Sequence, residues 1–136
     1  MLSKYQNIFI VILDKLTYAG NLGTIKKEVE DPRVEFVLGD ICNREVVSAI
    51  FEKYDIDYVV NFAAESHVDR SITNPQLFLT TNILGTQNML ECAKNAWATG
   101  KDNAGYPTYK EGKKYLQVST DEVYGDLPLD RPDLFF

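Results

Sequence analysis

The chain has 136 residues, of which 45% are hydrophobic and 25% are charged, which is typical of one folded domain. Its formal net charge is −6 and no cluster of Lys and Arg longer than a pair occurs, so we expect no nucleic-acid partner, because that class needs a concentrated basic face. The longest early apolar run, residues 8–13, is too short for a signal peptide or a membrane span. We therefore expect no membrane partner and a cytoplasmic location.

The first part of the chain alternates predicted strands and helices. Residues 8–13 form a β-branched and aromatic run, which is typical of a strand buried on both faces of a parallel sheet. A turn-rich stretch precedes a polar helix near residues 24–30, and a short strand is expected at residues 35–38. Asn43 can cap the next helix, in which apolar residues recur at three- and four-residue spacing.

The second part continues the alternation. Residues 57–62 are a nearly all-apolar strand, and Pro75 opens a long helix in which Gly85 implies close approach of another backbone or a cofactor. Residues 99–112 hold three glycines and one proline, which indicates a surface insertion, and a fourth strand follows at residues 114–119. The fold class predicted is α/β, a doubly wound parallel sheet with helices on both faces.

In such a sheet ligands bind outside the carboxyl ends of the strands, so the residues after each strand are the candidates. Asp14 follows the first strand, where an acidic residue can accept both hydroxyls of an adenosine ribose; the alternative is a turn cap. Gly20 and Gly23 come too late after that strand to cradle a phosphate and are expected to be turn glycines. Any Gly-rich phosphate loop would then lie upstream of Met1.

Two further strand ends carry candidates. Asp40 and Ile41 could bracket an adenine ring, although Asp40 could equally cap the following helix. After the third strand, two alanines leave room for a flat ligand, with polar residues crowded beside them. His67 is the only histidine, which excludes a multi-histidine metal site and favours a structural role for this side chain. Cys42 and Cys92 lack metal-ligand spacing and suit reduced structural thiols, so no metal is expected.

The fourth strand ends in Thr120, Asp121 and Glu122. Adjacent carboxylates at this edge can form an acid and base pair, because burial and mutual repulsion raise one pKa and leave the other group ionised. The alternative is a solvated turn.

These residues occur in five blocks, namely Asp14 to Asn21, Gly39 to Ile41, Ala63 to Ser71, Thr81 to Thr86 and Ser119 to Gly125. In order and spacing the blocks resemble the dTDP-glucose 4,6-dehydratases, which are extended short-chain dehydrogenase/reductases. The first and last blocks are specific to these enzymes, and the Gly39 and Thr81 blocks are shared across the superfamily.

The resemblance implies an NAD-dependent lyase. It implies conversion of dTDP-glucose to dTDP-4-keto-6-deoxyglucose by C4 oxidation, elimination of water across C5–C6 and hydride return to C6. The residues expected to hold NAD are Asp14, Lys15, Leu16, Thr17, Asp40, Ile41, Phe62, Ala63, Ala64, Glu65, Ser66 and Thr81. Ser66 and Thr120 are expected to contact the nucleotide-sugar substrate, and Glu122 and Asp121 to act as base and acid.

Two parts of the pattern lie outside the sequence. The first strand with its Gly-rich loop is absent, and so is the Tyr-x-x-x-Lys pair that follows the Thr-Asp-Glu block in this family. Tyr106 with Lys110, and Tyr109 with Lys113, match the spacing, but Pro107 and Gly112 disfavour the helix that each pair needs. We therefore expect residues 1–136 to be a partial NAD-binding Rossmann domain without its substrate domain. We expect it to be inactive by itself and part of a homodimer at full length.

Two alternative functions remain open. One is another sugar-nucleotide enzyme of the superfamily, a 4-epimerase or a GDP-mannose 4,6-dehydratase. An epimerase needs no eliminating acid and base, so the Asp121 and Glu122 pair argues against it. The other is a non-catalytic fragment that keeps only part of the cofactor site.

Overall fold

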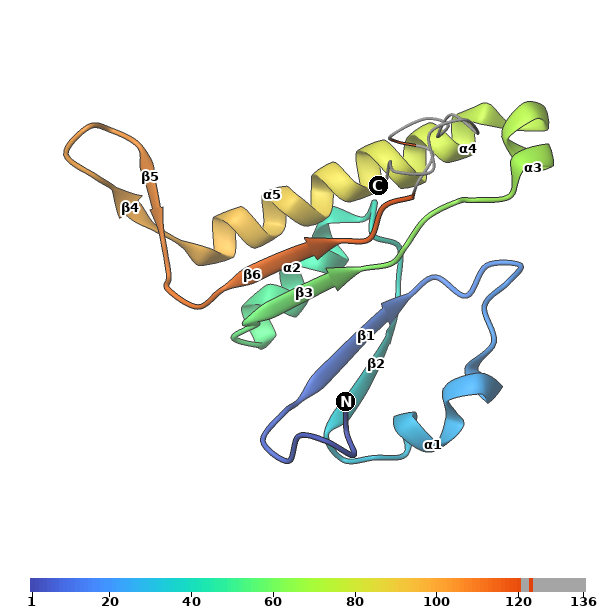
Figure 1. Ribbon diagram of the computed structural model, residues 1–136, viewed down its shortest axis with the longest axis horizontal. Helices are drawn as coiled ribbons and strands as arrows, with labels where there is room; N and C mark the ends of the chain where they lie inside the picture. The colour runs from blue at the N-terminus through green and yellow to red at the C-terminus, as the bar shows by residue number, and fades with distance from the viewer. Residues whose placement is uncertain (121–122, 124–136) are drawn as a thin grey trace, which may run out of the picture.

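Two pairs of parallel strands form the body of the protein. The structure, a computed structural model, describes residues 1–120 and residue 123. Strand β1 (Ile10–Asp14) pairs with β2 (Val34–Leu38), and β3 (Tyr58–Asn61) pairs with β6 (Lys114–Gln117) (Figure 1). These spans confirm the four predicted strands, because each begins and ends within a few residues of its predicted range.

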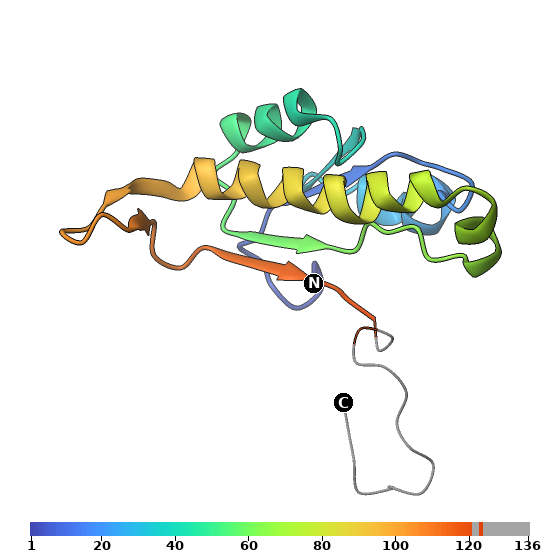
Figure 2. The ribbon, with the colours of Figure 1, turned by 90° about the horizontal axis from the view of Figure 1, so that it is seen from above.

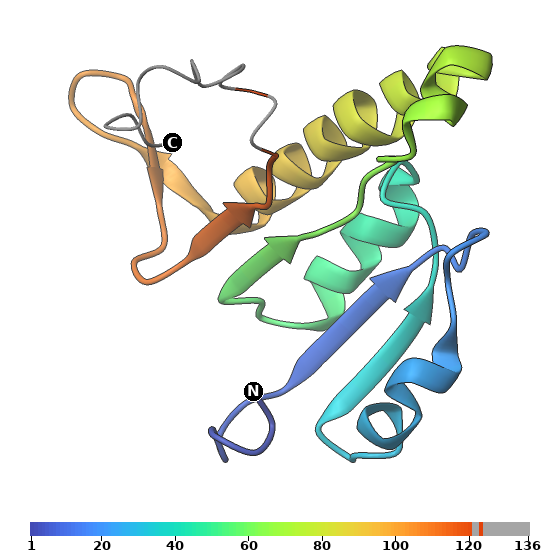
Figure 3. The ribbon, with the colours of Figure 1, turned by 45° about the vertical axis from the view of Figure 1, so that its right-hand side comes forward.

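The two pairs are separate sheets. Figures 1 and 3 both show β1 lying between β2 and β3, yet within the described ranges β1 and β3 share no ladder of hydrogen bonds. The α/β fold class, with an incomplete parallel sheet, is thus confirmed.

The helices connect the strands as predicted, with one addition. After β1 come a 3₁₀ turn, η1 (Leu22–Ile25), and α1 (Lys26–Val29), and α2 (Arg44–Lys53) follows β2. The Asn43 side chain accepts hydrogen bonds from the backbone N–H groups of Glu45 and Val46, which confirms its capping role. The short helix α3 (Val68–Thr73) was not predicted, because its polar sequence carries no apolar stripe.

The predicted long helix is a continuous run of three elements. These are α4 (Pro75–Phe78), a π-helical stretch η2 (Leu79–Gly85) and α5 (Thr86–Trp97). At Gly85 a Cβ atom would lie 2.6 Å from Cδ1 of Ile41, so this glycine admits the Ile41 side chain. The predicted close approach is made by the side chains of Ile41 and Cys42, in the loop after β2, and not by a backbone.

The core lies between α5 and β3. Val59, Ala93 and Trp97 form its buried cluster, and the Trp97 indole Nε1 donates to the Ile56 carbonyl oxygen at 2.8 Å. Figure 2 shows α2 and α5 on the same side of β3 and β6. Cys42 and Cys92 form no disulfide, as expected, and Cys92 is buried between these helices beside Ser48.

One local prediction was wrong. The run at residues 8–13 was expected to be buried on both faces, but Ile10 to Leu13 of β1 are only half-buried. Strand β3 likewise alternates, with Val59 and Asn61 buried while Tyr58 and Val60 are exposed. The reason is that the described residues place a helical layer over only one face of this strand. The predicted surface insertion at residues 99–112 is mostly exposed, and it contains an antiparallel hairpin of β4 (Ala98–Lys101) and β5 (Pro107–Tyr109).

The hairpin also shows how the two sequence matches to the Tyr-x-x-x-Lys pattern are folded. Tyr106 and Tyr109 lie in an extended segment, so neither is aligned with its lysine on a helix. The Lys113 ammonium is instead held at 2.8 Å by both Asp55 and Asp57. The prediction that no helix aligns these pairs is confirmed. None of the helices among the described residues is long and apolar enough to cross a membrane.

Replacement of Trp97 by Ala should lower the free energy of unfolding by about 3–5 kcal/mol, because it empties the centre of the core. Trp97→Phe is the matched variant: it keeps a ring in the core but leaves the Ile56 carbonyl without its donor, so a loss of about 1–3 kcal/mol is expected. Urea unfolding of the protein expressed from its complete reading frame measures both. Equal losses for the two variants would contradict a packing role.

Candidate functional site

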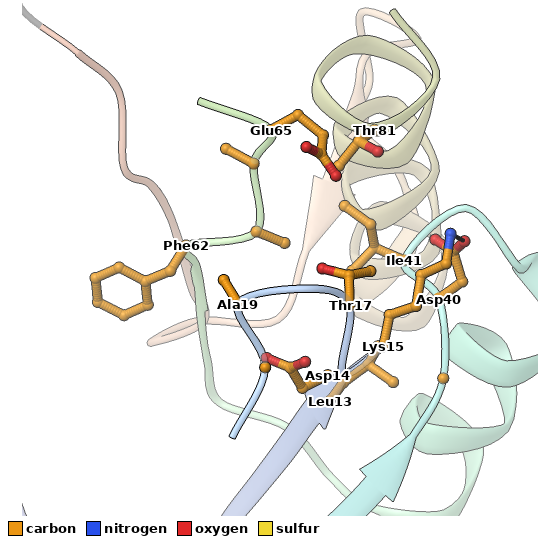
Figure 4. Close-up of a pocket in the computed structure, with 14 residues that line it drawn as sticks. Leu13, Asp14, Lys15, Thr17, Ala19, Asp40, Ile41, Phe62, Glu65 and Thr81 are labelled. Atoms are coloured by element: carbon orange, nitrogen blue, oxygen red, sulfur yellow. Dashed lines mark ion pairs between the residues drawn. The ribbon is translucent and has the colours of Figure 1, made fainter. Parts of the chain in front are cut away.

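A pocket opens at the carboxyl ends of β1, β2 and β3. Its walls come from the loops that follow these strands and from the η2 segment of the long helix (Figure 4). The lining residues are Leu13, Asp14, Lys15, Thr17, Ala19, Gly20, Gly39, Asp40, Ile41, Phe62, Ala63, Ala64, Glu65 and Thr81. Residues far apart in sequence are thus brought together at the edge where a doubly wound sheet binds ligands.

Almost all of the residues predicted to hold a cofactor line this pocket. The two that do not are Leu16, whose backbone N–H is turned to Asp14, and Ser66, which is exposed directly after Glu65. The Phe62 ring is 74% exposed and points away from the other lining side chains (Figure 4). The predicted residues therefore gather at one site. The contacts of each residue with a cofactor stay a prediction.

Asp14 makes the turn cap, which is one of the two roles that its sequence position allows. Its Oδ1 accepts the backbone N–H of Leu16 at 2.6 Å, so the turn cap is present. This bond holds Leu16 at a φ of 50°, a left-handed conformation that is uncommon outside glycine. Because an ionised carboxylate has about four acceptor positions, Asp14 keeps capacity for ribose hydroxyls while it shapes the loop.

Lys15 and Asp40 form an ion pair across the pocket wall. The Lys15 ammonium lies 2.5 Å from Oδ2 of Asp40, and Oδ1 of Asp40 accepts the Cys42 N–H at 2.9 Å. Burial alone would raise the pKa of Asp40, but hydrogen bonds from Lys15 and Cys42 hold that pKa below its usual range. The hydrogen bond to Asp40 also raises the pKa of Lys15. The pair is thus charged at neutral pH and fixes the wall beside Ile41.

Asp40 does not cap helix α2, which was its alternative role. Asn43 is the N-cap residue, and Asp40 braces the turn that precedes it. The interpretation of Gly20 as a turn glycine is confirmed: its N–H bonds the Thr17 carbonyl at 2.8 Å, and a Cβ would lie 2.5 Å from the Leu16 Cα. Gly23 instead lies inside η1, where its N–H is held by the Asn21 side chain.

The third wall follows β3. Ala63 and Ala64 leave an open surface, and Glu65 lies beside Thr81 (Figure 4). Glu65 is only 8% exposed, and its Oε2 has no hydrogen-bond partner within the described residues. A buried carboxylate oxygen without a donor is costly, so this atom fits a site that a ligand or a further chain segment completes.

Three asparagines that sequence reasoning missed hold these walls in place. The Asn82 amide accepts the Glu65 N–H and donates to the Glu65 carbonyl oxygen, both at 2.8 Å. Buried Asn88 donates to the Ile41 carbonyl oxygen at 2.7 Å, and buried Asn61 accepts the Ala63 N–H at 3.1 Å. The sequence signal that could have found them is an amide side chain within an apolar stripe. An amide is seldom buried without hydrogen-bond partners, so such a residue indicates a contact of this kind.

The predicted catalytic residues are only partly described. Thr120 follows β6 at the same edge as the pocket, and its carbonyl oxygen accepts the Val123 N–H at 3.3 Å. Asp121 and Glu122 lie outside the described residues. His67 is exposed at the start of α3 and its side chain makes no capping bond there. Among the described residues no group of His, Cys, Asp and Glu gathers in a way that could hold a metal ion.

The residues present suit the adenosine end of a dinucleotide. Asp14 could supply acceptors for a ribose, Asp40 and Ile41 an acceptor and an apolar face for a base, and the alanines room for close approach. The described pocket lacks a tight Gly-rich turn directly after a strand, which is the feature that cradles a pyrophosphate.

Comparison with known proteins gives a consistent result. A dTDP-glucose 4,6-dehydratase of Haemophilus influenzae is 48% identical over 91% of this chain and 35% of its own length. A crystal structure of a dTDP-glucose 4,6-dehydratase from Bacillus anthracis in complex with NAD superposes with a TM-score of 0.73 at 35% identity, covering 95% of this chain and 34% of that one. A 4-epimerase for UDP-Glc/GlcNAc from Campylobacter jejuni has a TM-score of 0.69 at 25% identity, over 88% and 32%.

The chain thus spans about a third of the length of the curated relatives that it matches. The family model described as GDP-mannose 4,6 dehydratase matches residues 1–132. The resemblance to dTDP-glucose 4,6-dehydratases is confirmed, and the chain belongs to the GDP-mannose 4,6-dehydratase family.

Proposed function

We propose that this chain is part of an NAD-dependent nucleotide-sugar 4,6-dehydratase that converts dTDP-glucose to dTDP-4-keto-6-deoxyglucose. The observation that carries this proposal is the pocket in which the loops after three parallel strands place Asp14, Asp40 and Glu65 around one cavity. The curated relatives that the chain matches are named dTDP-glucose 4,6-dehydratase, and the Bacillus anthracis structure is a complex with NAD.

The pocket would hold the adenosine half of NAD. Asp14 accepts the ribose hydroxyls and its charge disfavours a 2′-phosphate, which selects NAD over NADP. Asp40 and Ile41 receive adenine, while Lys15, Leu16 and Thr17 line the ribose side. The residues that line the path toward the nicotinamide are Phe62, Ala63, Ala64, Glu65, Ser66 and Thr81.

Residues 1–136 would be one part of the NAD-binding domain, with the substrate domain outside this chain. The edges of β1 and β3 face the same interval, and neither edge pairs with another strand among the described residues. A parallel strand in that interval would join the two sheets, and its Gly-rich turn would supply the pyrophosphate contacts that the pocket lacks. This is the arrangement that the doubly wound fold requires.

The residues proposed to carry out the reaction follow β6 in the sequence. NAD bound in the pocket would supply the hydride acceptor for oxidation at C4 and the hydride donor for C6. Thr120 would hydrogen-bond the sugar near C4, with Ser66 on the substrate side of the cofactor. The C4 ketone acidifies the C5 proton, which Glu122 removes, and protonated Asp121 delivers a proton to the departing C6 hydroxyl. An ionised base and a protonated acid side by side are what two coupled carboxylates provide.

The direct test is to incubate the protein expressed from its complete reading frame with dTDP-glucose and to assay a 4-keto-6-deoxy product. Parallel incubations with GDP-mannose and UDP-glucose distinguish the rival members of the family. We expect product from dTDP-glucose and none from residues 1–136 alone, because the redox tyrosine of the family lies outside them. Conversion of UDP-glucose to its 4-epimer, without elimination, would overturn the proposal.

We also propose a cytoplasmic homodimer, with a nucleotide sugar as substrate and neither a membrane nor a nucleic acid as a partner. In support, the long helix exposes an apolar stripe, of which Leu79, Ile83 and Leu90 are each about half exposed. Stripes of this kind mark protein interfaces more often than solvated faces. Recovery in the soluble fraction of lysed cells, free of nucleic acid, would support the location and the absence of those partners.

Replacement of Leu90 by Asp should convert this dimer to a monomer, because a charge would be buried at the centre of the interface. Size-exclusion chromatography with light scattering should give the mass of two chains for the wild type and of one chain for the variant. Tyr58→Asp, which places the same charge on an exposed residue of β3, is the control and should leave the dimer intact. A monomeric wild type would contradict the proposal.

A further inference from the structure

Two side chains outside the pocket lining connect its opposite walls. The Arg70 guanidinium lies over the ring of Tyr18, 3.8 Å from the ring centroid. Tyr18 stands between Thr17 and Ala19, which both line the pocket. Arg70 lies on α3, the helix that follows the wall ending at Glu65. The contact thus spans the rim of the pocket from one wall to the other.

This contact is informative because the two walls belong to different sheets. The Tyr18 loop follows β1 and the Arg70 helix follows β3, and these strands are not paired with each other. On the other side of the pocket the walls are joined by the α2 and α5 helices and by the Asn88 bond to the Ile41 carbonyl. Figures 1 and 2 both place the loop after β1 and α3 at the same end of the molecule.

The chemistry of the pair suits a reversible closure. A guanidinium stacked on an aromatic ring is held by its face, so its N–H edges stay available to water or a ligand. Arg70 forms no ion pair with a carboxylate within residues 1–120 and 123, and the Tyr18 ring is 59% exposed. The contact is therefore not a by-product of a salt bridge or of core packing, and it can open without loss of the fold.

We propose that Tyr18 and Arg70 form a latch across the rim of the cofactor pocket that slows dissociation of a bound dinucleotide. Both are positioning residues, which act by holding the loop of Thr17 and Ala19 against the wall of Ala63 to Glu65. This inference rests on the proposed function. Retention fits that function, because a cofactor that returns its hydride within one cycle need not leave between turnovers.

The test measures how fast NADH, used as a fluorescent analogue of NAD that keeps the adenine unchanged, leaves the protein expressed from its complete reading frame, with excess NAD as the displacing ligand in a stopped-flow experiment. Tyr18→Leu and Arg70→Met should each raise the dissociation rate about 2- to 5-fold, the range of an exposed cation–π contact. The double variant should be no faster than either single variant. Tyr18→Phe, which keeps the ring, should release the analogue at the wild-type rate.

Two further variants separate the latch from general effects. Arg70→Lys keeps the charge but loses the planar stack, so it should also release the analogue faster. Tyr5→Leu is the control. The Lys4 ammonium lies over the Tyr5 ring, 5.3 Å from its centroid, and this pair comes before β1 and away from the pocket. The variant should leave the dissociation rate unchanged. Unchanged dissociation in Tyr18→Leu and Arg70→Lys, or additive effects in the double variant, would overturn the latch alone. A wild type that binds neither NADH nor NAD would overturn the proposed function and the latch with it.

Discussion

Replacement of Glu122 by Gln is expected to lower kcat for formation of the 4-keto-6-deoxy sugar by about 10²–10⁴-fold, the usual contribution of a positioned general base. Glutamine keeps the size of the side chain but cannot remove the C5 proton. The affinity for NAD should be unchanged, because the residue is assigned to the sugar end of the crevice. Steady-state assay with dTDP-glucose measures the first effect, and calorimetric titration with NAD measures the second.

Glu111→Gln is the matched control for this experiment. Glu111 is an exposed carboxylate before β6, at the opposite end of the same strand, so its replacement should leave both kcat and NAD affinity at the wild-type values. A Glu122→Gln protein that keeps more than about a tenth of the wild-type kcat would show that another group removes the proton.

Replacement of Asp14 by Ala should weaken NAD binding by about 10- to 100-fold. The reason is the loss of hydrogen bonds between a charged carboxylate and the ribose, each worth about 1.5–3 kcal/mol. Loss of the Leu16 N–H bond should add to this effect by releasing the loop. Isothermal titration with NAD and with NADP measures both the affinity and the selectivity.

Two variants separate the ribose contact from the loop contact. Asp14→Asn keeps an oxygen for the Leu16 N–H but loses the charge, so it should bind NAD more tightly than Asp14→Ala and discriminate less against NADP. Asp102→Ala removes a similar turn bond, to Ala104 and Tyr106 in the hairpin, and should not change the affinity. An Asp14→Ala protein with the wild-type affinity would exclude a ribose contact.

The elements that could be predicted from the sequence are those with strong local signals. The β-branched run of β1, the Asn43 cap and the apolar spacing of α2 depend on neighbours within one or two turns. The site could be located for a different reason: in a parallel sheet the carboxyl ends share one edge, so Asp14, Asp40 and Glu65 had to converge.

The features that were missed depend on contacts between distant residues. The Lys15 and Asp40 ion pair joins two loops, and the Asn82 bonds join η2 to the loop of Glu65; neither residue pair has a spacing that reveals it. Helix α3 and the hairpin β4–β5 are short and polar, so they lack the periodicity on which prediction relies. One face of β3 is exposed because no helix of the described residues covers it. A run of apolar residues in the sequence does not specify which faces of a strand are covered.

The most direct measurement is a crystal structure of the protein expressed from its complete reading frame with NAD and a non-reacting dTDP-sugar bound. We expect the adenosine ribose hydroxyls within hydrogen-bond distance of the Asp14 carboxylate. We expect the sugar at the other end of the same crevice, beside Thr120 and Glu122. A dinucleotide bound away from the ends of β1, β2 and β3, or Asp14 and Glu122 on different rims of the sheet, would contradict the proposed site.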